Sequence, residues 1–137
     1  MKTGTDTPAN DADDSIIVAM PGQSIASGDM DGDYAGLVFT TDETYPVSVQ
    51  INGTTVTLAS VDPDTGVADG SINETITFVT FNSPNTGFIT GTLASGLRAV
   101  VCNANTDVAS SGKSLLFCSG SDPGVAANLF SLMLIEK

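Results

Sequence analysis

The sequence predicts an all-β domain, an up-and-down barrel of about eight antiparallel strands. Short runs rich in β-branched and aromatic residues recur between clusters of Gly, Pro, Asn and Asp, and several runs alternate apolar with polar residues. No helical stretch of normal length separates these runs, so consecutive strands are expected to pair as a single antiparallel meander. The 137 residues suit one domain. A β-sandwich is the alternative arrangement of the same strands.

The expected strands cover residues 32–40, 45–51, 54–61, 71–81, 87–93, 97–103, 115–119 and 127–136. Asn52-Gly53 joins two alternating runs and predicts a hairpin with a type I′ turn. Residues 15–20 are expected to form a further short strand that ends at Pro21-Gly22. The last run also has helix propensity. We predict a strand there, because a chain of hairpins needs a final partner, and a C-terminal helix packed on the sheet is the alternative.

Residues 1–14 differ in composition from the rest of the chain. They are polar and acidic, and composition predicts a disordered tether ahead of a single domain at 15–137. This stretch resembles the linker that follows the lipidated cysteine of bacterial lipoproteins, although that cysteine is not in the sequence. The resemblance implies a lipid anchor upstream. No signal peptide is present, so we expect the chain to be the mature part of an exported protein.

The chain is strongly acidic, with 16 Asp and Glu against 4 Lys and Arg and a formal net charge of −12. Such a chain repels phosphate backbones, so nucleic acid is not an expected partner. Solubility is the simplest use of this charge, and cation binding or the steering of a partner is the alternative. No apolar run reaches the roughly 18 residues that a membrane span needs.

Two cysteines and no histidine limit the use of the thiols. They cannot complete a four-ligand zinc site, and their spacing excludes a C-x-x-C redox motif. Cys102 and Cys118 are equidistant from Ser110, so they would lie opposite each other on paired strands, within reach of a disulfide. A disulfide implies an oxidising compartment, and we expect an extracytoplasmic location: periplasmic, envelope-anchored or secreted.

Asp29, Asp31 and Asp33 form the main candidate metal site, and Asp62, Asp64 and Asp69 form a second cluster to which the same argument applies. Alternate aspartates can gather around Ca²⁺, which takes six to eight oxygen ligands. The first stretch superficially resembles the start of an EF-hand loop, but Tyr34 stands where that loop has Gly and Thr40 where it has Glu. The alternative is a solvated acidic loop. Apart from calcium here, no cofactor is expected.

Alternation places Glu74 on one face of its strand together with Ile72, Ile76 and Phe78, so Glu74 points inward if that face is the core. A buried carboxylate must be paired or protonated. Arg98 is the only arginine, and a Glu74–Arg98 pair would form a polar anchor in a ligand cavity. The alternative is that Glu74 lies near a strand end and reaches solvent.

Enzymatic chemistry is not expected. Without histidine there is no general acid–base group of that type near neutral pH and no Ser-His-Asp or Cys-His set. Neither a G-x-S-x-G elbow nor a P-loop occurs. A carboxylate pair for glycoside hydrolysis is the remaining enzymatic alternative.

Gly32-Asp33-Tyr34 opens the first regular strand and is similar to the G-x-W opening of calycins, the lipocalin and avidin-like barrels, with Tyr34 in place of Trp. The resemblance implies a barrel that encloses a small apolar ligand or closes on a packed core. The resemblance carries over no binding residues by itself. The candidate ligand-binding residues are Glu74 and Arg98, from the predicted inward pair, together with Tyr34. We expect a non-enzymatic exported domain that binds a small ligand or a protein partner. The alternative is a structural or interaction module of a surface assembly, with a filled core and no small-molecule pocket.

Overall fold

A computed structural model describes residues 2–3, 15–16, 18–40, 43–94, 99–122 and 125–137. Strands make up most of this part of the chain. Their bounds are β1 Lys2–Thr3, β2 Ser15–Ile16, β3 Gly32–Phe39, β4 Thr44–Asn52, β5 Thr55–Val61, β6 Ala68–Phe81, β7 Phe88–Leu93, β8 Ala99–Asn105, β9 Leu115–Asp122 and β10 Val125–Glu136. A 3₁₀ turn, Val108–Ser110, is the one helical element described, and no described helix is long and apolar enough to cross a membrane.

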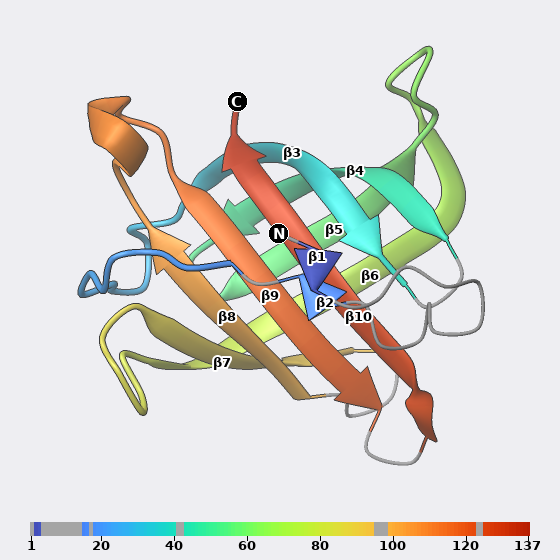
Figure 1. The fold of residues 1–137 in the computed structure, drawn as a ribbon. Coiled ribbons are helices and arrows are strands. Elements are labelled where there is room, and N and C mark those ends of the chain that lie inside the picture. Colours follow the sequence, from blue (N-terminus) through green and yellow to red (C-terminus); the bar gives the residue numbers. More distant parts are fainter. Residues whose placement is uncertain (1, 4–14, 17, 41–42, 95–98, 123–124) are drawn as a thin grey trace.

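Strands β3 to β10 form a closed barrel in which every strand is antiparallel to its neighbours (Figure 1). Neighbours in the barrel are also neighbours in sequence, and β10 closes the ring on β3. The up-and-down barrel is thus confirmed over the sandwich. The C-terminal run is a strand, as predicted, and it pairs with both β9 and β3. The short strands β1 and β2 pair with each other as a separate two-stranded sheet.

The β4–β5 hairpin is confirmed, but its turn lies one residue later than predicted. Asn52 pairs with Thr55, so the two turn residues are Gly53 and Thr54. Only Gly53 has a positive φ, 59°. The predicted type I′ turn at Asn52-Gly53 is therefore wrong. A positive φ at the first central position alone is typical of a type II′ turn, for which glycine is the favoured residue there.

Alternate residues of the strands point into the barrel and form one apolar core. Inward positions that are almost fully buried include Val38, Val49, Val56, Ile76, Ile89, Leu116, Leu132 and Leu134. Among the buried apolar residues all but Leu93 are at most 4% exposed. Side chains this deeply buried pack against one another and fill the part of the barrel interior in which they lie.

One end of the barrel is plugged by the chain that precedes β3. Ile25 and Met30 are buried in the core cluster. The Asn82 side chain, after β6, accepts a hydrogen bond from the Ile25 N–H at 2.9 Å and donates one to the Ile25 carbonyl at 2.8 Å. Gln23 also exchanges two hydrogen bonds with Thr106, after β8: its side-chain amide donates to the Thr106 hydroxyl, and its side-chain oxygen accepts from the Thr106 N–H. We call residues 23–31 the plug and this end of the barrel the plugged end.

Candidate functional site

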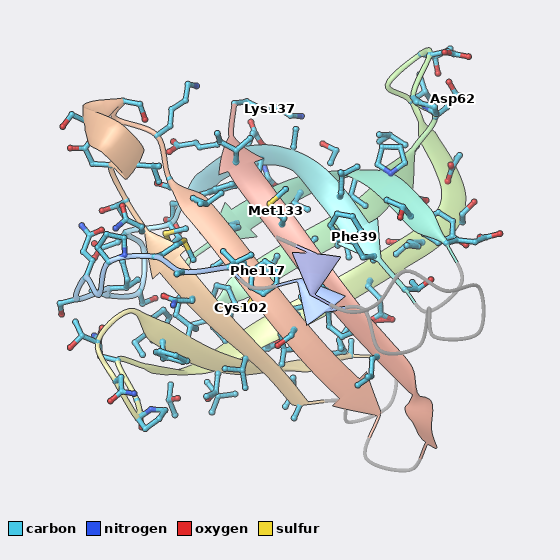
Figure 2. The ribbon with its side chains drawn as sticks, in the orientation of Figure 1. Phe39, Asp62, Cys102, Phe117, Met133 and Lys137 are labelled. Atoms are coloured by element: carbon cyan, nitrogen blue, oxygen red, sulfur yellow. A yellow bond between two sulfur atoms is a disulfide. The ribbon has the colours of Figure 1, made fainter. Side chains whose placement is uncertain are left out.

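Cys102 and Cys118 form a disulfide, as predicted. They are directly opposite each other on β8 and β9, with their Cα atoms 3.9 Å apart, and both side chains are buried in the core (Figure 2). The bond fixes the register of these two strands. It is compatible with an oxidising, extracytoplasmic compartment.

The three aspartates of the candidate calcium site have separate contacts. Asp29 Oδ2 accepts a hydrogen bond from the Ala26 N–H at 2.8 Å, and Asp31 Oδ1 accepts one from the Gly53 N–H at 2.6 Å. Asp33 is exposed on β3. Among the described residues, no three Asp, Glu, His or Cys side chains come close enough to hold a metal ion. Asp29 and Asp31 thus order the chain that leads into β3, and calcium binding stays a prediction.

Tyr34 is fully buried beside the plug. Its hydroxyl donates a hydrogen bond to the Met30 carbonyl at 2.9 Å. Burial raises the pKa of Tyr34 above its usual value of 10.0, so the phenol stays neutral. Tyr34 therefore holds the plug against the first barrel strand. The calycin resemblance that drew attention to this residue stays a prediction.

Glu74 faces inward on β6, in register with Leu58 of β5. Its Oε2 atom is buried and has no hydrogen-bond partner among the described residues. The inward position is therefore confirmed. Arg98 lies outside the described residues, so the Glu74–Arg98 pair stays a prediction. Glu74 lies near the middle of β6, the strand that leads into the Asn82 turn beside the plug.

Sequence analysis did not predict the most distinctive surface of the molecule, which is an apolar area on the outer surface of the barrel. Leu129, Ile135, Val101 and Met133 are 55%, 51%, 42% and 39% exposed. They point outward from β8 and β10, and Leu115 and Phe117 lie half-buried on β9 between them. We call these six outward side chains the apolar face. Figure 2 shows Phe117 and Met133 on neighbouring strands, where they are directly paired.

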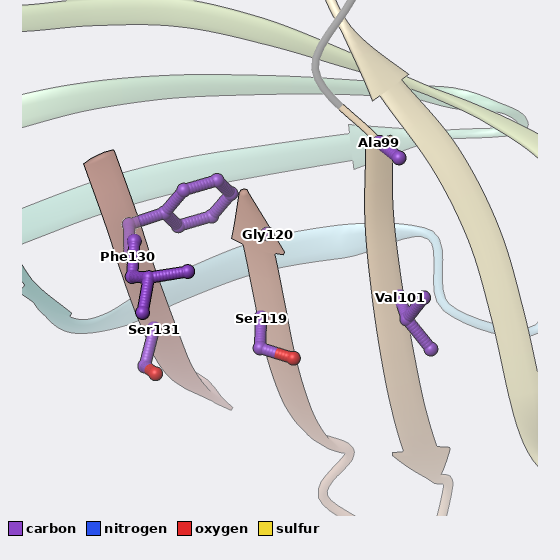
Figure 3. A pocket seen from close by; sticks show the side chains of 7 residues that line it. Ala99, Val101, Ser119, Gly120, Phe130 and Ser131 are labelled. Atoms are coloured by element: carbon purple, nitrogen blue, oxygen red, sulfur yellow. The ribbon is translucent and has the colours of Figure 1, made fainter. Parts of the chain in front are cut away.

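The strand register extends this surface around the barrel. One row of paired outward residues crosses six strands, namely Phe88, Asn103, Phe117, Met133, Leu37 and Pro46. A shallow hollow of about 360 Å³ lies beside the row, bordered by Val101, Ser119, Leu129 and Ser131 (Figure 3). The ring of Phe130 lies against Gly120 at its floor. The apolar face thus includes a recess that a partner's side chains can enter.

The charge distribution sets this surface apart. Across β7 to β10 the only charged residues are Asp122 and Glu136, each the last residue of its strand. On the other side of the barrel, outward positions of β5, β6 and β7 carry threonine, at Thr55, Thr57, Thr75, Thr77, Thr90 and Thr92. A chain of net charge −12 therefore keeps the central part of its apolar face free of charge.

A signal for this face was present in the sequence. A half-buried strand alternates apolar and polar residues, but the run LFSLMLI at 129–135 is apolar at almost every position. Because alternate residues of a strand point to opposite faces, only half of this run can point into the barrel. The other apolar residues of the run must therefore lie on the outer surface. Comparison with protein-family models, with curated proteins and with solved structures finds no match, so function is argued from these residues alone.

Proposed function

We propose that this chain is a non-enzymatic, extracytoplasmic domain that binds a protein partner on its apolar face. One observation carries the proposal: exposed Leu, Ile, Val and Met side chains gather on β8 and β10, in the uncharged part of a very acidic molecule. Contiguous exposed apolar patches mark interaction sites. The core of a protein interface is depleted in charge and enriched in aromatic residues and Met, which matches Phe117 and Met133.

Other binding roles have less support. The net charge of −12 disfavours nucleic acid. The buried apolar side chains fill the part of the barrel interior in which they lie, which disfavours a ligand there. We further propose that residues 1–14 act as a tether, with a lipid anchor upstream, which would hold the domain at the cell envelope.

Site-specific photo-crosslinking tests the proposal. A benzophenone amino acid replaces Leu129 on the apolar face or, as the matched control, Thr77 on the threonine side, and both proteins are expressed in the organism of origin. We expect a discrete adduct from position 129 and none from position 77. Adding Val101→Lys should abolish the adduct, because it buries an unpaired charge at the interface. Equal labelling from both positions, or none from 129, contradicts the proposal.

The mass of the adduct also separates two forms of the proposal. A partner of different mass supports a binding domain. An adduct of twice the chain's own mass supports the alternative, a structural module that assembles from copies of itself on a surface.

A second candidate function is the binding of a small ligand at Glu74, near the middle of β6. The buried, unpaired Oε2 atom of Glu74 favours it, because such an atom gains from a hydrogen-bond donor. Native mass spectrometry of protein purified from its own envelope fraction tests it. A mass excess that disappears on denaturation and is absent in Glu74→Gln supports the ligand. Equal native and denatured masses contradict it.

A further inference from the structure

The residues just before the plug lie along the outside of β8 and β9. Val18 borders a hollow of about 190 Å³ together with Phe88, Val101, Asn103 and Phe117. Ala19, Met20 and Pro21 border a second hollow, of about 230 Å³, with residues of the β8–β9 region that include Asn105, Val108 and Leu115. We call residues 18–21, sequence VAMP, the strap. The strap is an extended, uncharged segment on part of the apolar face.

The strap leaves part of this surface uncovered. A hollow that is open to solvent adjoins the strap at each of the two places described. The Asn103 Oδ1 atom, beside the first hollow, is buried and has no hydrogen-bond partner among the described residues. An unpaired buried acceptor is unfavourable and would be satisfied by a donor such as a peptide N–H. The surface therefore has room and a hydrogen-bonding group that the strap leaves unused.

The strap can leave without disturbing the plug. In the described part of the chain, the side-chain hydrogen bonds that fasten the N-terminal region to the barrel begin at Gln23 and continue at Ile25. Pro21, the last residue of the strap, and Gly22, which separates the strap from these bonds, are exposed.

Beyond the strap the same surface is open. Val101 and Ser119 border both the hollow under Val18 and the larger hollow of about 360 Å³ near Leu129. We call the two hollows, which share these two lining residues, the groove along β8 and β9. Val18 of the strap borders the half nearer the plugged end, and no strap residue borders the half beside Leu129.

We infer that this groove binds an extended, uncharged apolar peptide segment of the partner, and that the strap competes with that segment for the site. The inference rests on the proposed function and specifies the chemistry of the partner. The strap itself is the argument for this occupant, because it is a segment of that kind seated in the groove. A charged segment would bury its charge against Phe88 and Phe117 without a counter-ion.

A synthetic peptide with the sequence of residues 15–21, SIIVAMP, carrying a fluorescent label, is a direct probe. Its binding to the full-length protein is measured by fluorescence anisotropy. In Val18→Asp the strap is expelled from the apolar groove, so we expect the peptide to bind about tenfold more tightly than to the unchanged chain, because competition lowers the apparent affinity. Ser24→Asp adds the same charge at an exposed position of the plug, and should bind like the unchanged chain.

Adding Val101→Asp to Val18→Asp should abolish binding, because Val101 borders both halves of the groove. Val101 is 42% exposed, so this variant is expected to fold, which circular dichroism checks. The inference is overturned if Val18→Asp binds no more tightly than Ser24→Asp, or if Val101→Asp leaves binding unchanged. Should the crosslink from Leu129 persist in that case, the proposed function stands and only the peptide groove is wrong.

Discussion

At the scale of the residue, two glycines set how closely strands of the barrel approach each other and their side chains. A Cβ at Gly36 would lie 1.9 Å from the Met133 carbonyl oxygen and 2.8 Å from a methyl carbon of Leu134. A Cβ at Gly120 would lie 2.3 Å from the Phe130 ring. The Phe130 side chain can rotate away from a new methyl group. The Met133 carbonyl oxygen is part of the β10 backbone and can move only if the strand moves. Gly36 is therefore the stricter requirement for closing β10 on β3.

Gly36→Ala should lower the free energy of unfolding by about 3 kcal/mol, at the upper end of the usual cost of overpacking, because the β3–β10 pair must separate locally. Gly22→Ala is the matched control. The nearest atom to a Cβ there is 3.5 Å away and its φ is not positive, so its unfolding energy should change little. Urea denaturation measures both. Equal effects of the two substitutions would show that the strand contact is not limiting.

Asp69 has a pKa lowered from its usual 3.8, chiefly by the hydrogen bond from the Ser60 hydroxyl and then by the Ser71 N–H at 2.8 Å. Because the folded-state pKa is lowered, the carboxylate stabilises the fold fully above about pH 3.8, and this contribution disappears as the pH falls through the lowered pKa. Ser60 also accepts the Ile72 N–H at 2.7 Å. These hydrogen bonds among Ser60, Asp69, Ser71 and Ile72 stabilise the β-bulge in which β6 carries extra residues opposite Ser60.

Urea midpoints measured from about pH 5 down to about pH 3 test this contribution. The midpoint of the unchanged chain should fall more steeply with acid than that of Asp69→Asn, which has already lost the ionisable group. Asp64→Asn is the control, because no described residue donates a hydrogen bond to the Asp64 carboxylate, and its curve should follow that of the unchanged chain. Parallel curves for the unchanged chain and Asp69→Asn would contradict the assignment.

At the scale of the element, the strands were readable from sequence and the plug was not. Alternation and turn residues located every barrel strand, and the symmetry of Cys102 and Cys118 about Ser110 gave the β8–β9 register. These signals are local or depend on one pair of strands. The path of residues 18–31 depends on bonds to Asn82 and Thr106, far along the chain, and no short-range pattern encodes such partners.

Asn82 is the side chain that fastens the plug most extensively. It exchanges two hydrogen bonds with the Ile25 backbone and accepts a third from the Gly87 N–H at 3.2 Å. Its φ of 56° suits Asn better than most residues. Asn82→Ala should lower the free energy of unfolding by about 2–3 kcal/mol, or about 1 kcal/mol for each bond lost.

Asn82→Asp provides the matched comparison, because an Asp keeps the oxygen that accepts from Ile25 and Gly87 but places a second carboxylate oxygen opposite the Ile25 carbonyl oxygen. It should also destabilise the fold at neutral pH, and the loss should shrink in acid, where the protonated carboxyl group can donate to that carbonyl, measured by the same urea denaturation. Hydrogen exchange at the Ile25 amide adds a local readout, and protection should fall strongly in the Ala variant. Unchanged exchange at Ile25 would mean that Asn82 does not hold the plug.

At the scale of the whole molecule, the charge is divided unevenly between surfaces. Apart from Glu74, which faces inward on β6, the acidic residues described lie in the chain before β3, in loops and near strand ends, and the apolar face lies on strands whose only charged residues are terminal. Composition gave the net charge, but not this separation, because which residues share an outer face depends on the closure of the ring between β10 and β3. Mutual repulsion of the acidic residues then keeps molecules apart and leaves the apolar face available to a partner.

This division predicts how the protein behaves as its charge is removed. The sequence pI is about 4.1, so repulsion weakens as the pH falls toward that value, and apolar faces can then meet. Light scattering should show a monomer at pH 7 and larger species as the pI is approached.

Val101→Lys with Leu129→Lys should stay monomeric near the pI, because association through the apolar face would bury two ammonium groups. Val67→Lys with Val79→Lys changes the charge equally at positions that are 65% and 63% exposed, outside the apolar face, and should associate like the unchanged chain. Circular dichroism at each pH confirms that the barrel is intact. Identical behaviour of the two double variants would mean that net charge alone controls association and that the apolar face has no part in it.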